Sequence, residues 1–131
     1  MNAFDNVSID DQSFSWRELQ DLDRWELFTP TFTSLTVVGA TTYVGRVRLV
    51  GAQCFFQVTA LAATSIASTA GTTYMTLPVT ARGLTGMGTM TNGTTNVAVG
   101  VCDIDGPNSR CWLPAQAASG NTFRIAGWYE V

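Results

Sequence analysis

From residue 29 onward, the chain is divided into short segments rich in Thr, Val, Phe and Tyr, with Gly, Asn and Ser between them. Such segments favour strands, and the small polar residues between them favour turns. The last segment alternates most clearly, with Phe123, Ile125, Tyr129 and Val131 on one face and the intervening residues on the other. The predicted strands are 30–38, 43–50, 52–60, 72–78, 96–103, 110–114 and 122–131.

Short strands at this spacing predict an all-β fold, an antiparallel β-sandwich or jelly roll. No long helical pattern alternates with them, which disfavours a parallel α/β sheet. The chain has 131 residues, enough for one domain with a substantial core. We therefore assign 29–131 to the β-sandwich domain. Within it, 82–93 is rich in Gly and Met and is predicted to be a long loop.

Residues 1–28 are different in kind and are assigned to an N-terminal arm with one short helix. Ser15 and Glu18 fit a capping box, and Phe14 and Leu19 could form the accompanying hydrophobic staple. The helix would run to about Glu26. Its apolar side chains either pack on the chain's own sandwich or dock a neighbouring subunit or larger assembly. The candidate anchor contacts are Phe14, Trp16, Leu19, Leu22 and Trp25.

The N-terminal part and the rest of the chain also differ in net charge. Residues 1–30 carry seven carboxylates and two arginines, a net of −5, whereas 31–131 carry five arginines and three carboxylates, a net of +2. An acidic arm on a nearly neutral body argues against a nucleic-acid partner, which needs a clustered basic face. No apolar run is long enough for a membrane span, so no membrane insertion is expected.

The residue inventory predicts no enzyme. The chain has neither His nor Lys, which removes the commonest general base and any Schiff base. The carboxylates of the strand region are Asp103, Asp105 and Glu130, and nothing in their spacing makes two of them converge as a glycosidase would require. The segment from Asp103 to Gly106 lacks the further ligands of a calcium loop. No metal or cofactor is expected.

Cys102 and Cys111 flank a strong turn signal at 105–108. If Ile104 and Ser109 close that turn, Cys102 lies opposite Cys111 and Asp103 lies opposite Arg110. The two thiols would then face each other and could oxidise, or they would be buried side chains that never react; the second interpretation is favoured. Cys54 is predicted to lie in the core. Arg46 and Arg48 are predicted to share the polar face of their strand.

Several motifs, in order, resemble a domain common in virion structural proteins of tailed bacteriophages. A Trp and a Thr-Pro-Thr element open the first strand at Trp25–Phe32, and a strand containing a Gly follows at Tyr43–Gly51. A Phe-rich strand, a strand ending in Leu-Pro and a closing Gly-x-Tyr strand come next, at Cys54–Val58, Tyr74–Pro78 and Gly127–Val131. The resemblance covers about residues 25–131.

The resemblance implies a homotrimeric β-sandwich in a virion, assembled in the host cytoplasm. Its partners would be further copies of itself and other virion proteins of the capsid or tail. Because an acidic arm and one short helix precede the domain instead of a fibrous shaft, we expect a capsid decoration or head-fibre protein attached through its N-terminal arm. The alternative is a tail-fibre or tail-tip module that binds a host-surface glycan or receptor through the loops around 62–71 and 82–95.

Composition independently favours an oligomer. Charged residues make up only 13% of the chain. A surface with so little charge exposes apolar area that association with further copies would bury.

Overall fold

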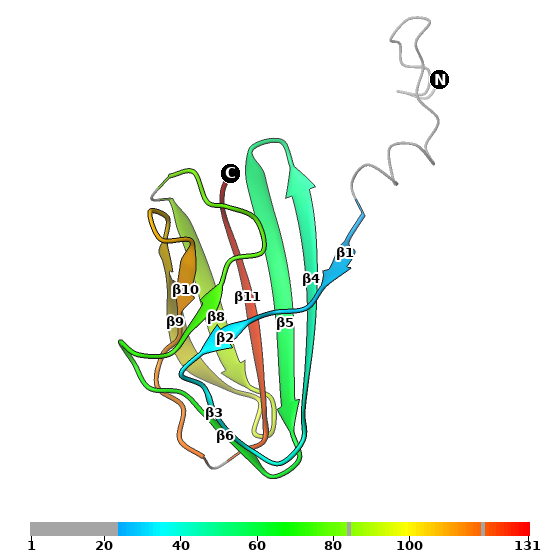
Figure 1. Cartoon of the computed structure of the whole chain (residues 1–131), viewed down its shortest axis with the longest axis vertical. Helices are drawn as coiled ribbons and strands as arrows, with labels where there is room; N and C mark the ends of the chain where they lie inside the picture. The colour runs from blue at the N-terminus through cyan, green and yellow to red at the C-terminus, as the bar shows by residue number, and fades with distance from the viewer. Residues whose placement is uncertain (1–23, 84, 119) are drawn as a thin grey trace, which may run out of the picture.

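The computed structural model describes residues 24–83, 85–118 and 120–131, and every regular element within them is a β-strand. The strands are β1 Glu26–Phe28, β2 Phe32–Thr33, β3 Thr36–Val38, β4 Thr41–Val50, β5 Gln53–Ala62, β6 Ser65–Ala67, β7 Tyr74–Thr76, β8 Gly86–Asn92, β9 Val97–Asp105, β10 Arg110–Trp112 and β11 Thr122–Glu130 (Figure 1). The prediction of an all-β, antiparallel fold is confirmed. Among the described residues, no helix could span a membrane.

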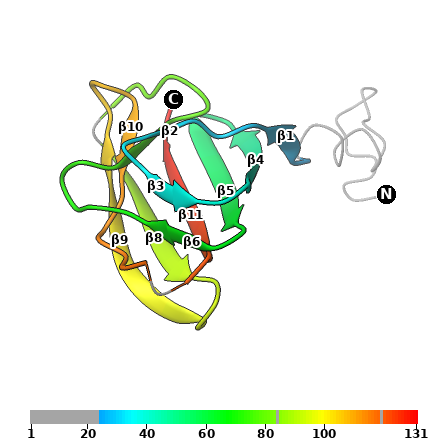
Figure 2. The same ribbon diagram turned by 60° about the horizontal axis from the view of Figure 1, so that its bottom comes forward.

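Nine strands form one large antiparallel sheet in the order β1-β4-β5-β11-β8-β9-β10-β7-β2, and β3 pairs with β6. The sheet curls, and β2, β3 and β6 lie across its inner face (Figure 2). Phe32 of β2 reaches across the core, because its ring lies 5.6 Å from that of Phe123 in β11. Ile66 of β6 is fully buried from the same side. This closed arrangement is consistent with a β-sandwich.

Alternation along the long strands decides which side chains enter the core. In β5, Cys54, Phe56 and Val58 are buried while Gln57 and Thr59 between them are exposed. The same period holds in β11, where Phe123, Ile125 and Tyr129 are buried. The predicted faces of the last strand and the predicted core position of Cys54 are therefore confirmed. The predicted polar face of Arg46 and Arg48 is also confirmed, since Arg46 is exposed and Arg48 only half-buried between inward-facing neighbours.

A pair of glycines makes room for the ring of Phe56 on β5. Gly127 of β11 lies opposite Gly88 of β8. A Cβ atom added to Gly127 would lie 2.8 Å from Cζ of Phe56 and 2.5 Å from the backbone oxygen of Met87. The Phe56 ring therefore occupies the space that a side chain at residue 127 would need. The ring is buried and lies 5.9 Å from that of Tyr129.

The N-terminal half differs from the prediction at two places. The segment 30–38 is divided into β2 and β3 because Ser34, with φ 60°, adopts a left-handed conformation that interrupts the strand. The predicted helix would reach about Glu26, but Glu26–Phe28 is extended and pairs with Gly45–Val47 of β4. Gly45 permits this pairing, since a Cβ there would lie 2.6 Å from the Phe28 ring. The preceding part of that helix, 15–23, lies outside the described residues.

The predicted loop at 82–93 is wrong, because most of it is strand β8. β8 lies between β11 and β9 and pairs with both. Its inward residues Gly88, Met90 and Asn92 are buried, whereas Met87 and Thr89 are exposed. Backbone hydrogen bonds on both edges outweigh the low intrinsic strand propensity of glycine. Strand β6 was also missed, as three residues are too few to show a period.

We expect Gly127→Ala to lower the free energy of unfolding by about 2 kcal/mol, because the added methyl group must displace the Phe56 ring or the backbone of β8. Gly88→Ala is the matched control, since its Cβ would meet Cys102 Cβ at a milder 3.2 Å. Urea denaturation of both variants would measure the difference. Equal free energies of unfolding for the two variants would show that a methyl group fits at residue 127 without displacing its neighbours.

Candidate functional site

A row of large side chains crosses the outer face of four neighbouring strands. Arg48 of β4 lies opposite Phe55 of β5, Phe55 opposite Trp128 of β11, and Trp128 opposite Met87 of β8. Trp25, directly before β1, extends the row at the edge of the sheet, because Arg48 Cζ lies 5.1 Å from its ring centroid. We call Trp25, Arg48, Phe55, Trp128 and Met87 the aromatic row.

Two arginines lie close to the rings of Trp25 and Phe55 in this row. Arg46 Cζ lies 5.2 Å from the Trp25 ring centroid, and Arg48 Cζ lies 5.4 Å from that of Phe55. Guanidinium groups at these distances are attracted to the ring faces. Arg46 also donates a hydrogen bond to Oε1 of Gln57. Trp25 is thereby fixed on the chain's own sheet, beside two cations.

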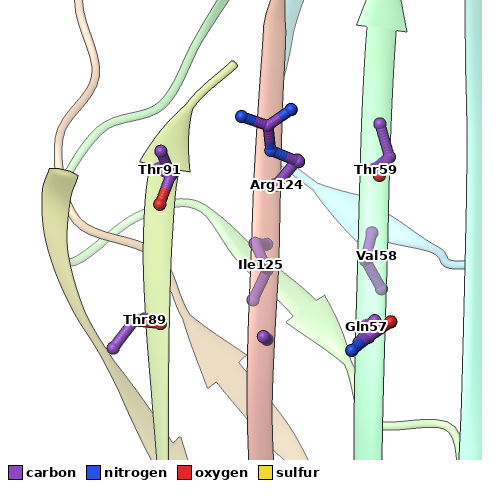
Figure 3. Close-up of a pocket in the computed structure, with 8 residues that line it drawn as sticks. Gln57, Val58, Thr59, Thr89, Thr91, Arg124 and Ile125 are labelled. Carbon is purple, nitrogen blue, oxygen red and sulfur yellow. The ribbon is translucent and has the colours of Figure 1, made fainter. Parts of the chain in front are cut away.

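Beside the aromatic row, the outer face is hollowed along β11. Two adjoining hollows of about 330 and 340 Å³ share Gln57, Thr89 and Ala126 as lining residues. The small Ala126 lies between the longer side chains of the other two, because it is opposite both of them in the sheet. Arg124 lies at one end between Thr59 and Thr91 (Figure 3). We call the two hollows together the outer groove.

Positive charge exceeds negative charge on the outer face. Arg46, Arg48 and Arg124 lie on it against the one carboxylate of Glu130 among the described strands β4, β5, β8 and β11, and Arg124 donates a hydrogen bond of 2.9 Å to the neutral Oδ1 of Asn96. Threonine hydroxyls and the Gln57 amide line the groove between them. Rings, cations and neutral polar groups on one rigid surface suit the binding of an aromatic or anionic group. Within the described parts of the chain, no three His, Cys, Asp or Glu side chains gather to hold a metal ion.

A third hollow, of about 380 Å³, is separate from the outer groove and lies beside Trp112 of β10. Asp103 and Val101 line it together with Ala70 and Gly71 of the loop after β6. The Trp112 ring packs against the Tyr74 ring, with 4.9 Å between the two ring centroids. Its Nε1 donates a hydrogen bond of 3.4 Å to Oδ2 of Asp105. Hydrogen bonds from Asn108, and then from Trp112, lower the pKa of the Asp105 carboxyl.

The predicted pairing of β9 with β10 is wrong by two residues. Arg110 lies opposite Asp105 and Cys111 opposite Ile104, so neither Cys102 nor Asp103 faces its predicted partner. The turn has the predicted length of four residues but is shifted by one, to 106–109, because Ser109, with φ 52°, belongs to it, and the Asp105 carboxylate accepts hydrogen bonds from Asn108 across it.

The two thiols nevertheless remain neighbours inside the core. Cys102 and Cys111 lie on the inner faces of adjacent strands, both buried and both free. A hydrogen bond with the Cys102 thiol and burial raise the pKa of Cys111 well above its ordinary value. Burial shields both sulfurs from solvent. That the two thiols never react, the interpretation favoured from the sequence, stays a prediction.

The other buried acids of the core are held neutral in the same way. Burial raises the pKa of the Cys54 thiol and that of the Tyr129 hydroxyl. Tyr129 donates a hydrogen bond of 2.7 Å to the Val79 carbonyl and accepts one of 2.9 Å from the Val79 N–H. The tyrosine thus connects the central strand to the segment after β7.

We expect stability to fall as the pH rises above about 9, the ordinary pKa of a thiol. Cys54, Cys111 and, from about pH 10, Tyr129 lose protons when unfolded but keep them when folded, so the unfolded state binds fewer protons. Each group steepens the loss by at most about 1.4 kcal/mol per pH unit. Urea titrations from pH 7 to 11 would measure the slope, and Cys111→Ala should reduce it. A flat profile would contradict the buried, protonated core.

The sequence located the site only in part. Of the predicted anchor contacts, Trp25 lies on the chain's own sheet, whereas Phe14, Trp16, Leu19 and Leu22 lie outside the described residues. The sequence did not identify Phe55, Met87, Trp128 or Arg124 as one surface. Alternation shows that Phe55 and Trp128 point outward, but their proximity depends on the pairing of β5 with β11.

Comparison of the chain with protein-family models, curated proteins and solved structures finds no match.

Proposed function

We propose that the chain is a non-enzymatic structural protein of a bacteriophage virion. In this proposal it is a homotrimeric accessory protein, a capsid decoration or head-fibre subunit with a jelly-roll type of sandwich, attached through residues 1–28. The motif order over 25–131 supports the assignment to a virion, and the all-β fold is compatible with it. The acidic N-terminal segment supplies the attachment.

The observation that carries the proposal is an open, apolar edge of the large sheet. β4 runs over ten residues, but β1 pairs only with Gly45–Val47 in its middle. Leu27 and Val44 stand on the outer face at this edge and are 79% and 49% exposed, and Leu61, one strand farther in on β5, is 48% exposed. We call these three residues the edge patch. A strand edge with exposed aliphatic side chains is a surface that another chain can cover.

Association through the edge patch fits a closed ring of identical subunits. Three copies related by rotation would each bury the same edge against a neighbour and leave no edge open. The low charge of the chain, 13%, lowers the cost of bringing such surfaces together. Phe55, Trp128 and Met87 of the aromatic row lie farther in on the sheet and can remain available in the assembled trimer.

We expect sedimentation of the full chain to give a native mass three times 14.1 kDa. The double substitution Leu27→Glu and Val44→Glu should reduce that mass about threefold, because each carboxylate would be buried without a partner. Thr76→Glu, an exposed change on the distant strand β7, is the matched control. Circular dichroism would verify that all variants keep their strands. A monomeric parent protein, or a trimer indifferent to the double substitution, would overturn the proposal.

A second function is favoured by the hollow beside Trp112: binding of a host-surface glycan. A half-buried indole ring that lines a hollow next to a carboxylate, here Asp103, suits the apolar face and the hydroxyl groups of a sugar. The loop around 62–71 contributes Ala70 and Gly71 to this hollow, as the alternative from the sequence requires. The region 82–95 does not contribute, since most of it is strand β8.

For this second function, a glycan array should show binding that Trp112→Ala weakens about tenfold, the effect of losing one ring contact of about 1.4 kcal/mol. Trp128→Ala removes the same kind of side chain from the outer face and serves as the control. Silence across a broad array, or equal losses in both variants, would remove glycan binding at this hollow.

A further inference from the structure

We infer that the aromatic row and the outer groove are the docking site of the protein's own N-terminal segment, residues 14–23. The sequence leaves open whether the apolar side chains of this segment pack on their own domain or on another molecule. The geometry of the outer face points to the first, and it identifies the surface. The inference goes beyond the proposed virion role and does not rest on it.

The path of the chain places the segment at this surface. Trp25 already lies on the outer face between Arg46 and Arg48, so the residues before it start at the edge of the aromatic row. The part of the predicted helix from Ser15 to Arg24, before the extended residues of β1, would be about 15 Å long. The four strands of the outer face, spaced about 4.8 Å apart, span about 14 Å from the first to the last. A helix of this length crosses the face once.

The apolar content of the two surfaces matches. Trp16, Leu19 and Leu22 recur at three-residue spacing and would gather on one side of a helix. The outer face offers Phe55 and Trp128, both half-buried, and Met87, which is 50% exposed. The hollow over Ala126 leaves room for a leucine side chain beside them. Docking would remove these apolar groups from water on both sides.

Charge complementarity distinguishes this occupant from a second copy of the domain. The outer face carries Arg46, Arg48 and Arg124 against Glu130, whereas residues 1–23 carry six carboxylates and one arginine, a net of −5. Two outer faces brought together would set like charges against each other. A nucleic acid would also suit arginines and rings, but it must displace a segment whose tether gives it an effective concentration in the millimolar range.

Docking has a consequence for attachment. If residues 14–23 also contact a larger particle, they must leave the outer face to do so. A free subunit and an attached one would then differ in whether the aromatic row is covered.

Disulfide trapping in the full chain tests the inference. Leu19→Cys combined with Thr89→Cys puts one thiol on the segment and one on the groove lining, while the three native thiols are buried. We expect mild oxidation to give a disulfide within one chain, seen as a faster monomer band on a non-reducing gel and mapped by peptide mass. Leu19→Cys with Thr76→Cys, exposed on β7, is the matched control and should cross-link at least tenfold more slowly.

The arginines supply the second readout. Arg46→Gln together with Arg124→Gln, or 0.5 M salt, should slow cross-linking several-fold, because the attraction between the acidic segment and the face is screened or removed.

Equal rates for the two cysteine pairs would overturn the inference. Disulfides that join two chains would overturn it in favour of segment exchange between subunits. Binding of an oligothymidine that displaces the cross-link and requires Arg124 would assign the face to nucleic acid instead. A failed cross-link with an intact trimer mass would leave the proposed virion role unaffected.

Discussion

The unbroken pairing of β11 with both of its neighbours is the constraint on which the rest of the structure depends. β11 pairs with β5 from Thr122 to Glu130 and with β8 from Phe123 to Tyr129. Side chains alternate with a period of two, so a shift of one residue would exchange the inner and outer faces. The inner residues of β11 include Phe123, Ile125 and Tyr129, which are buried against the second layer. That burial fixes the register, and the register fixes everything placed on the outer face.

The inner face of this central strand packs in the core, whereas its outer face forms part of the outer groove and the aromatic row. Inside, the absence of a side chain at Gly127 lets Phe56 close against Tyr129, whose hydroxyl is in turn bonded to Val79. Outside, the residues next to Gly127 are Ala126, which forms the floor of the outer groove, and Trp128, which forms the middle of the aromatic row. A rigid, fully paired strand therefore positions a binding surface without any loop having to become ordered.

The open edge and the outer face suggest separate uses for neighbouring surfaces. Leu27 and Val44 lie where β4 lacks a continuous partner, which suits contact with another copy through a strand edge. The aromatic row suits a segment that brings rings and carboxylates. Trp25 belongs to the chain segment that connects the two, because it lies on the outer face directly before the edge strand β1. The surface for association with another copy and the surface for docking of the N-terminal segment would thus adjoin each other near Trp25.

The sequence by itself determined the all-β class, the strands with a clear period and the core positions they imply. Cys54 and the inner residues of β11 follow from alternation alone, since alternation is a local property. It failed where local preference was weak: the glycines of β8 favour a loop until two neighbouring strands supply hydrogen bonds on both sides. It also misplaced the pairing of Cys102 and Cys111, because the position of a turn depends on hydrogen bonds such as those of Asp105. The outer face was decided only by the tertiary structure. Arg48, Phe55, Trp128 and Met87 come from four strands that are distant in sequence, and only the register of the folded sheet brings them into one row.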